Sequence, residues 1–161
     1  MQYQPAELEN YPGYHIRRLQ QIAVAVFMEE TEEFGVTPVQ YAALSAVLRQ
    51  PGIDQRTLAA KVSFDTSTIA GVVDRLEARG LLTRSQHSGD RRVRLLHLTA
   101  AGEKLLAALV PPMQQTQKRI LEPLSAAERK LFMNMLQRVI EHHDELEGAD
   151  GAATAAGSRL P

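Results

Sequence analysis

The sequence predicts a mainly α-helical protein with one small β-hairpin. Most of the chain carries apolar residues at helical spacing. Only residues 81–99 change to short runs rich in Leu, Thr and Val, which are typical of extended strands. A length of 161 residues suits one domain of ordinary size. The predicted fold is therefore a set of helices around a single hairpin.

The first two helices are separated by a clear boundary. Apolar residues recur through residues 13–34 with Arg and Gln between them, which indicates a long amphipathic helix that ends at Gly35. Residues 37–40 then combine an N-cap hydroxyl, a proline suited to the first helical turn and a glutamine placed to reach back to the cap. A second helix should run from there to about Gln50.

Two further helices with a tight connection follow. A Pro-Gly pair breaks the chain at residues 51–52, and Asp54 can cap a short helix. After a connection at residues 63–64, another helix is predicted for residues 65–79, and Gly80 ends it. One face of this helix is apolar and the other is polar.

The hairpin and the C-terminal helices complete the chain. Residues 81–87 and 93–99 are the predicted strands, and the charged tip between them reads Ser-Gly-Asp-Arg-Arg. Thr99 can cap a helix whose apolar stripe continues to Leu124, although prolines at 111 and 112 should kink or interrupt it. A capping box at residues 125–128 opens the last helix. Residues 148–161 lack an apolar period and are predicted to be a disordered tail.

Composition excludes several classes of function. The chain has no cysteine, which rules out disulfides, thiolate metal sites and thiol-based sensing. A net charge of -1 argues against a protein that coats nucleic acid by bulk charge. Neither a signal peptide nor a membrane-spanning run is recognisable, so no membrane partner and a cytoplasmic location are expected.

The sequence also lacks the patterns of an enzyme. It contains no glycine-rich phosphate loop, no Gly-x-Ser-x-Gly motif and no cluster with metal-ligand spacing. His142 and His143 are adjacent, so on a helix they point about 100° apart, which favours solvated histidines over metal ligands. We therefore expect no catalytic site, no cofactor and no bound metal.

The middle of the chain has the pattern of a winged helix-turn-helix. Two short helices with a tight turn, followed by a basic-tipped hairpin, are typical of this DNA-binding motif. Residues 54–95 hold eight basic and five acidic side chains, so positive charge is concentrated in a near-neutral protein. Thr66, Ser67 and Thr68 lie near the start of the second short helix, where small polar groups can approach base edges and phosphates. Arg75 suits either a phosphate contact or an ion pair with Asp74.

These blocks resemble the MarR family of transcription regulators. The resemblance rests on Leu-Ala at 58–59, Val-Asp-Arg-Leu-Glu-Ala-Arg-Gly-Leu-Leu at 73–82, Asp-Arg-Arg at 90–92 and Leu-Thr-Ala-Ala-Gly at 98–102, and it covers roughly residues 13–145. It implies a dimer that reads a pseudo-palindromic operator, with the wing tip in a minor groove. By the same resemblance Arg92 looks like the minor-groove arginine, Asp90 the carboxylate that orients it, and Arg91 a phosphate neighbour. Ala70 and Gly71 depart from the larger polar residues of many relatives, which favours readout through Thr66, Ser67, the backbone and DNA shape.

The resemblance also suggests a division of labour along the chain. Residues 1–36 would hold an N-terminal segment and the first dimerisation helix, and residues 37–99 the DNA-binding lobe. Residues 100–147 would form the C-terminal dimerisation helices, ahead of the tail. Dimerisation is the simplest way to bury the apolar stripes of the terminal helices, and it spaces two recognition helices about one DNA turn apart.

A small-molecule effector is the remaining expectation. Relatives commonly bind small, often aromatic, anions between the dimer helices and the DNA-binding lobe. Tyr14, His15 and Arg18 on the first helix and Tyr41 on the second are suited to a phenolic carboxylate, because Arg or protonated His pairs with the acid while Tyr offers a ring face and a hydroxyl. The expected function is a repressor released by such a ligand. Three alternatives stay open: an activator, a DNA-binding protein without an effector, and a winged-helix module that binds only proteins.

Overall fold

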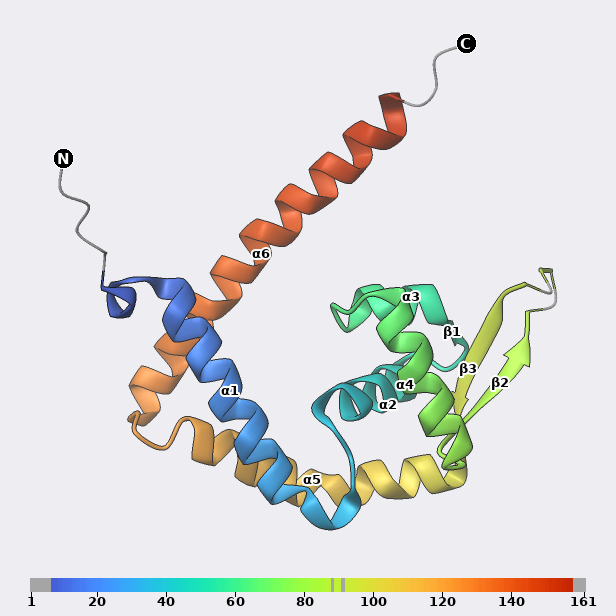
Figure 1. Cartoon of the computed structure of the whole chain (residues 1–161), viewed down its shortest axis with the longest axis horizontal. Helices are drawn as coiled ribbons and strands as arrows, with labels where there is room; N and C mark the ends of the chain where they lie inside the picture. Colours follow the sequence, from blue (N-terminus) through green and yellow to red (C-terminus); the bar gives the residue numbers. More distant parts are fainter. Residues whose placement is uncertain (1–6, 88, 91, 158–161) are drawn as a thin grey trace. The chain divides into compact units, whose positions relative to one another are not determined.

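The computed structural model describes residues 7–87, 89–90 and 92–157 (Figure 1). The chain forms two compact units that divide after Ile120. The elements of the first unit are η1 (Leu8–Asn10), α1 (Pro12–Glu30), η2 (Glu32–Phe34), α2 (Pro38–Arg49), β1 (Ile53–Asp54), α3 (Gln55–Lys61), α4 (Thr66–Ala78), β2 (Leu82–Gln86), β3 (Arg94–Leu98) and α5 (Ala100–Ile120). The second unit contains α6 (Ala126–Gly157).

The predicted first helix is divided near its end. α1 stops at Glu30, and the separate 3-10 turn η2 follows before Gly35, which has the left-handed φ of 58°. The hydroxyl of the buried Thr31 donates to the carbonyl of Phe27 at 2.8 Å. A threonine that bonds back to the preceding turn competes with the regular helix pattern, so the chain can tighten here.

α2 and α3 begin at the predicted caps Thr37 and Asp54, and α4 is capped by Asp65, which was predicted to begin the helix itself. Thr37 and Gln40 form the reciprocal capping box of α2. The side chain of Asp54 accepts the backbone N–H of Thr57 at the start of α3, and that of Asp65 accepts the N–H of Thr68 at the start of α4. Each bond satisfies a helix N–H that would otherwise lack a partner.

The hairpin belongs to a three-stranded antiparallel sheet in the order β1-β3-β2. Leu82 pairs with Leu98 and Gln86 with Arg94, as the predicted hairpin requires. The third strand, β1, was not predicted, because two residues are too short to show an alternating pattern. It pairs with the β3 edge next to the start of α3, so it ties the wing to the helix-turn-helix.

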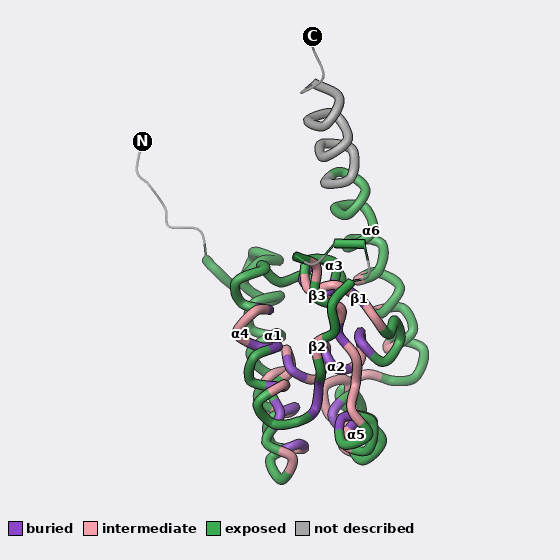
Figure 2. Tube along the Cα trace, turned by 90° about the vertical axis from the view of Figure 1, so that its right-hand side faces the viewer, coloured by how far each residue is buried: buried purple, intermediate pink, exposed green. Residues whose placement is uncertain are grey.

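One core lies beneath these elements (Figure 2). Its fully buried side chains come from α2, α3, α4 and the sheet and include Leu44, Leu58, Ile69, Leu76 and Leu96. Burying a side chain of this kind contributes about 1.5 to 3 kcal/mol. The core therefore fixes α4 and the hairpin to one another.

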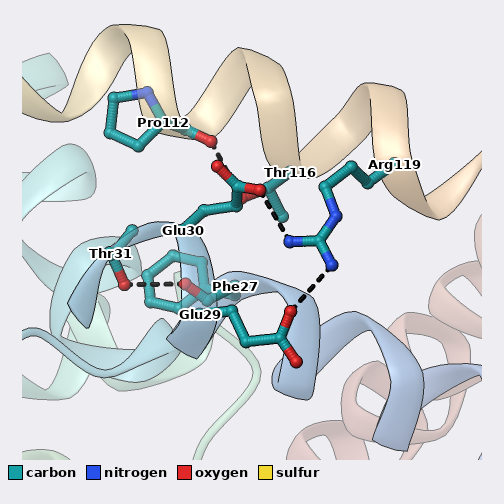
Figure 3. Close-up of polar contacts among 7 residues, drawn as sticks. All are labelled: Phe27, Glu29, Glu30, Thr31, Pro112, Thr116 and Arg119. Atoms are coloured by element: carbon teal, nitrogen blue, oxygen red, sulfur yellow. Dashed lines mark hydrogen bonds and ion pairs between the residues drawn. The ribbon is translucent and has the colours of Figure 1, made fainter.

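Pro111 and Pro112 were predicted to kink or interrupt the fifth helix. The helix is not interrupted, because α5 is continuous through both residues. α5 packs against α1. Beyond the prolines, Arg119 donates to Glu30 at 2.6 Å and to Glu29 at 2.7 Å (Figure 3). Tertiary contacts thus compensate for the backbone hydrogen bonds that proline cannot make.

α6 begins at the predicted capping box. The backbone N–H of Ser125 donates to Glu128 at 2.8 Å, and the N–H of Glu128 donates to the Ser125 hydroxyl at 3.4 Å. The helix extends to Gly157, so residues 148–157 are helical where the sequence analysis predicted disorder. Several of these residues are alanine, which has the highest helix propensity and can continue a helix without an apolar period.

Within the described residues, no helix combines the length and the apolar character needed to cross a membrane.

Candidate nucleic-acid interface

Of the three small polar residues predicted at the start of α4, two face outward and the third takes part in the helix cap. Thr66, Ser67 and Thr68 are all exposed. The hydroxyl of Thr68, however, donates to the carboxylate of Asp65 at 2.5 Å, so its proton is committed to the helix cap. The hydrogen bonds from the Thr68 hydroxyl and then its backbone N–H lower the pKa of Asp65 below its ordinary value. Thr68 thus helps to build the helix start, while Thr66 and Ser67 face outward.

A cleft of about 390 Å³ joins the start of α4 to the base of the wing. Thr66 lies on its wall together with three arginines: Arg56 of α3, Arg92 of the hairpin loop and Arg94 of β3. The structure therefore brings Thr66 and Arg92 together although they are far apart in sequence. Arg56 and Arg94 were counted in the basic surplus but not singled out as site residues, because only the sheet register places them beside Thr66.

The wing tip is held by hydrogen bonds that Asp90 accepts from two backbone N–H groups. Its carboxylate accepts the backbone N–H of Arg92 at 2.9 Å, and its carbonyl accepts the N–H of Val93 at 3.1 Å. The resemblance implied that Asp90 orients the Arg92 side chain, but in this structure the carboxylate bonds to the Arg92 backbone instead. Asp90 therefore shapes the turn from which the arginine projects. The predicted phosphate neighbour Arg91 lies outside the described residues.

The suggested ion pair between Asp74 and Arg75 is replaced by a different one. Asp74 bonds to Arg84 of β2 at 2.5 Å, and Arg84 also bonds to Glu77 of α4. Partial burial opposes the charge of this guanidinium, but the hydrogen bonds to Asp74 and Glu77 outweigh that effect and raise the pKa of Arg84. Arg75 is exposed and its guanidinium lies near Gly71 on its own helix. A phosphate contact remains open to Arg75.

The four predicted effector residues do not form one site within the first unit. Tyr14 and Arg18 line a cleft of about 760 Å³ at the start of α1, together with Tyr11 and Arg17. The Nε2 atom of His15 lies 2.7 Å from the carbonyl oxygen of Glu9, so this ring is joined to the preceding turn.

Tyr41 lies in a different place from the other three predicted effector residues. Its ring packs near Phe27 at a centroid distance of 6.0 Å. It lines a separate cleft of about 300 Å³ between α2 and α5. Helical periodicity predicted which face each residue occupies, but not which face of α1 meets α2.

The two adjacent histidines of α6 are not part of a metal-binding cluster among the described residues. These hold no group of three or more His, Asp or Glu side chains arranged to bind a metal ion. The rings of His142 and His143 lie edge to face with centroids 5.5 Å apart.

A helix-turn-helix with an antiparallel wing and a basic cleft between them defines a winged-helix DNA-binding protein. The family model described as "MarR family" matches residues 36–93, which hold this lobe. The transcriptional regulator HosA from Escherichia coli O127:H6 is 35% identical over 133 residues, which cover 83% of this chain and 97% of HosA. The chain therefore belongs to the MarR family, whose members are transcription regulators and not enzymes.

Solved structures agree with this assignment. The PcaV regulator from Streptomyces coelicolor, in complex with its natural ligand, is 37% identical, with a TM-score of 0.80 over 86% of this chain and 98% of that chain. BpsR from Bordetella bronchiseptica, whose structure describes regulation of its DNA binding by 6-hydroxynicotinic acid, is 29% identical with a TM-score of 0.79. That match covers 84% of this chain and 97% of BpsR.

Proposed function

We propose that this regulator is a homodimeric repressor that binds a pseudo-palindromic operator and is released from it by a small aromatic carboxylate. One observation supports the mode of DNA binding most directly: Thr66 of α4 and Arg92 of the wing line the same basic cleft as Arg56 and Arg94. In the proposed complex, α4 enters the major groove and the wing arginine reaches the adjacent minor groove.

Each group in this cleft has a distinct task in the proposal. Thr66 and Ser67 contact base edges or phosphates at the helix start, where the backbone N–H groups and the helix dipole favour anions. Arg56 and Arg94 neutralise phosphates and so contribute sequence-independent affinity. Arg92 enters the narrow groove, whose negative potential attracts a guanidinium. Arg75 and, by the family resemblance, Arg91 serve as further phosphate contacts.

Exposed apolar side chains support the proposed dimer. Tyr11, the N-cap of α1, is 50% exposed and Ile16 of α1 is 59% exposed, and on α6 the exposed fractions of Leu131, Val139 and Ile140 are 55%, 56% and 57%. Apolar side chains repeated along helices mark an interaction surface more often than isolated ones do. A second copy of the chain would cover them in a two-fold arrangement, which presents two α4 helices to two half-sites.

Two side chains support the proposed effector class. Tyr14 provides a ring and a hydroxyl, and Arg18 provides a guanidinium suited to a carboxylate, and both line the cleft at the start of α1. The PcaV and BpsR structures concern regulators with small-molecule ligands, and 6-hydroxynicotinic acid is an aromatic acid. The proposed dimer would have to bring His15 and Tyr41 toward the same ligand, since one chain keeps them apart.

Release follows if the ligand binds one conformation better than the other. The effector would favour a dimer in which the two α4 helices no longer match the half-site spacing. Only a difference in affinity between the two conformations can move this equilibrium. A ligand that binds both equally would leave operator affinity unchanged.

Fluorescence anisotropy with a labelled duplex tests the DNA-binding part of the proposal. The duplex is selected by the wild-type protein from a randomised pool, and the salt concentration is held fixed. Arg92→Ala should weaken binding by about 1 to 3 kcal/mol. Lys130→Ala, at an exposed position near the start of α6, should leave binding unchanged. Equal affinities for the wild type and Arg92→Ala would overturn the wing assignment.

A further inference from the structure

His87, which follows the last residue of β2, holds the wing tip through a ring nitrogen. Its Nδ1 atom accepts the backbone N–H of Gly89 at 3.0 Å and that of Asp90 at 3.2 Å. Two N–H groups can share one ring nitrogen only if that nitrogen carries a lone pair. Nδ1 is therefore the acceptor in this arrangement.

These bonds belong to a chain of contacts that ends at Arg92. The backbone N–H of His87 donates to the carbonyl of Val93 at 3.1 Å and closes the loop. The His87 ring fixes the amides of Gly89 and Asp90, and Asp90 in turn accepts the N–H groups of Arg92 and Val93. The ring thus acts on the turn from which the wing arginine projects.

The described residues of the wing tip are exposed to solvent. His87, Gly89, Asp90 and Arg92 are all exposed, so no apolar packing orders them. Exposed turns rely on local side-chain to backbone hydrogen bonds for their conformation. Loss of the ring acceptor would let the loop sample other conformations, and DNA binding would then have to order it.

We propose that His87 is a positioning residue for DNA binding, whose unprotonated Nδ1 preorganises the wing so that Arg92 meets the minor groove. The inference rests on the proposed DNA-binding mode, because Arg92 is the group through which His87 acts. His87 itself need not touch DNA. By ordering the loop before DNA binds, His87 reduces the conformational entropy that the loop loses on binding.

A matched pair of substitutions tests the acceptor. The Oδ1 atom of asparagine stands on the same γ carbon as Nδ1 of histidine and accepts hydrogen bonds, whereas leucine has nearly the shape of asparagine and accepts none. His87→Leu should weaken binding to the selected duplex about 3- to 10-fold, as expected for two lost hydrogen bonds. His87→Asn should bind within about twofold of the wild type.

A double-mutant cycle then distinguishes positioning from direct contact. If His87 acts through Arg92, His87→Leu should have no further effect once Arg92 is alanine. Thermal unfolding followed by circular dichroism should be the same for all variants, because these side chains are exposed. Equal unfolding excludes a loss of fold as the cause of weak binding.

The outcomes separate the inference from the proposed function. Weak binding by Arg92→Ala together with wild-type binding by His87→Leu overturns the role of His87 and leaves the DNA-binding mode in place. The role of His87 is also overturned if His87→Asn binds the duplex as weakly as His87→Leu, or if the effects of the two substitutions in the cycle are additive. If Arg92→Ala itself has no effect, it is the proposed DNA-binding mode that fails.

Discussion

Arg84 illustrates how one side chain can connect the wing to the recognition helix. It lies on β2 and bonds to Asp74 and Glu77, which are one turn apart on α4. The guanidinium side chain is 21% exposed, so water screens the pair less than at an open surface. This contact fixes the angle at which the hairpin leaves the lobe.

Replacing Arg84 by methionine should therefore destabilise the fold. The variant keeps much of the aliphatic stem but leaves two carboxylates without their partner, at a cost of about 1 to 2 kcal/mol. Urea unfolding measures this loss. Arg94→Met, at an exposed position of β3, is the control and should change the free energy of unfolding by less than about 0.5 kcal/mol. Equal stability of the two variants would show that the bridge contributes nothing.

Asp54 gives the fold a dependence on acid pH. Hydrogen bonds from the side chain and then the backbone of Thr57 hold the pKa of Asp54 below its ordinary value of 3.8. A lowered folded-state pKa means that the stabilisation is complete above 3.8 and disappears as the pH falls through the folded value.

Asp54→Ala should cost about 1 kcal/mol at neutral pH, because α3 loses its N-cap. The difference from the wild type should narrow as the pH falls below 3.8, where the wild-type carboxylate takes up a proton. Unfolding at neutral and at acid pH checks both points. Asp144→Ala, at an exposed position on α6, should show no comparable loss. A gap for Asp54→Ala that stays constant down to the most acid pH would contradict the linkage.

At the scale of elements, Gly102 sets the approach of α5 to the sheet. A Cβ atom at this position would lie 2.3 Å from the carbonyl oxygen of Leu81. This carbonyl also accepts the N–H of Thr99 at the start of α5. Backbone atoms cannot give way as a flexible side chain can, so only glycine allows the helix this close to β2.

Gly102→Ala should destabilise the protein by about 1 to 3 kcal/mol. Gly13→Ala is the matched control, since nothing lies within 4 Å of a Cβ at Gly13, and it should stabilise α1 slightly. Thermal unfolding of the two variants makes the comparison. A Gly102→Ala protein as stable as the wild type would mean that α5 and the sheet can separate without cost.

The elements also show what a sequence can predict and what it cannot. The caps at Thr37 and Asp54 were predictable because each depends on residues within one turn, whereas Asp65, predicted to begin the next helix, is the residue that caps it. The cleft that joins Thr66 to Arg56, Arg92 and Arg94 depends on the register of β3 against β1 and β2, which leaves no local signal. The sequence offered Arg75 as one possible partner of Asp74, whereas the structure pairs Asp74 with Arg84, which is distant in sequence.

The continuity of α5 and the place of Tyr41 have a similar explanation. Proline lowers helix propensity locally, but the packing of α5 on α1 and the ion pairs of Arg119 act from elsewhere in the chain. Tyr41 carries suitable chemistry for an aromatic acid, yet its place against Phe27 and α5 separates it from Tyr14. Suitable side-chain chemistry alone therefore predicts more residues for the effector site than a single chain brings together.

At the scale of the whole molecule, dimerisation and DNA binding should fail together. Val139 is an exposed apolar residue of α6, and glutamate there would place a charge in the proposed dimer surface. Val139→Glu should be monomeric in sedimentation velocity and bind the selected duplex about 100-fold more weakly, because one half-site is lost. Gln137→Glu, at another exposed position of the same helix, should remain dimeric. A monomeric Val139→Glu that still bound with wild-type affinity would contradict the coupling.

The central claim, a DNA-binding dimer released by an aromatic acid, is tested most directly by one anisotropy experiment. The preformed complex with labelled duplex is titrated at fixed salt with hydroxylated benzoic and cinnamic acids, and with the corresponding benzyl and cinnamyl alcohols as controls that lack the carboxylate. We expect one acid to dissociate the wild-type complex, its alcohol to leave the complex intact, and Arg18→Gln to retain DNA in the presence of that acid. Specific binding that no acid relieves, or equal release by acid and alcohol, would contradict the claim.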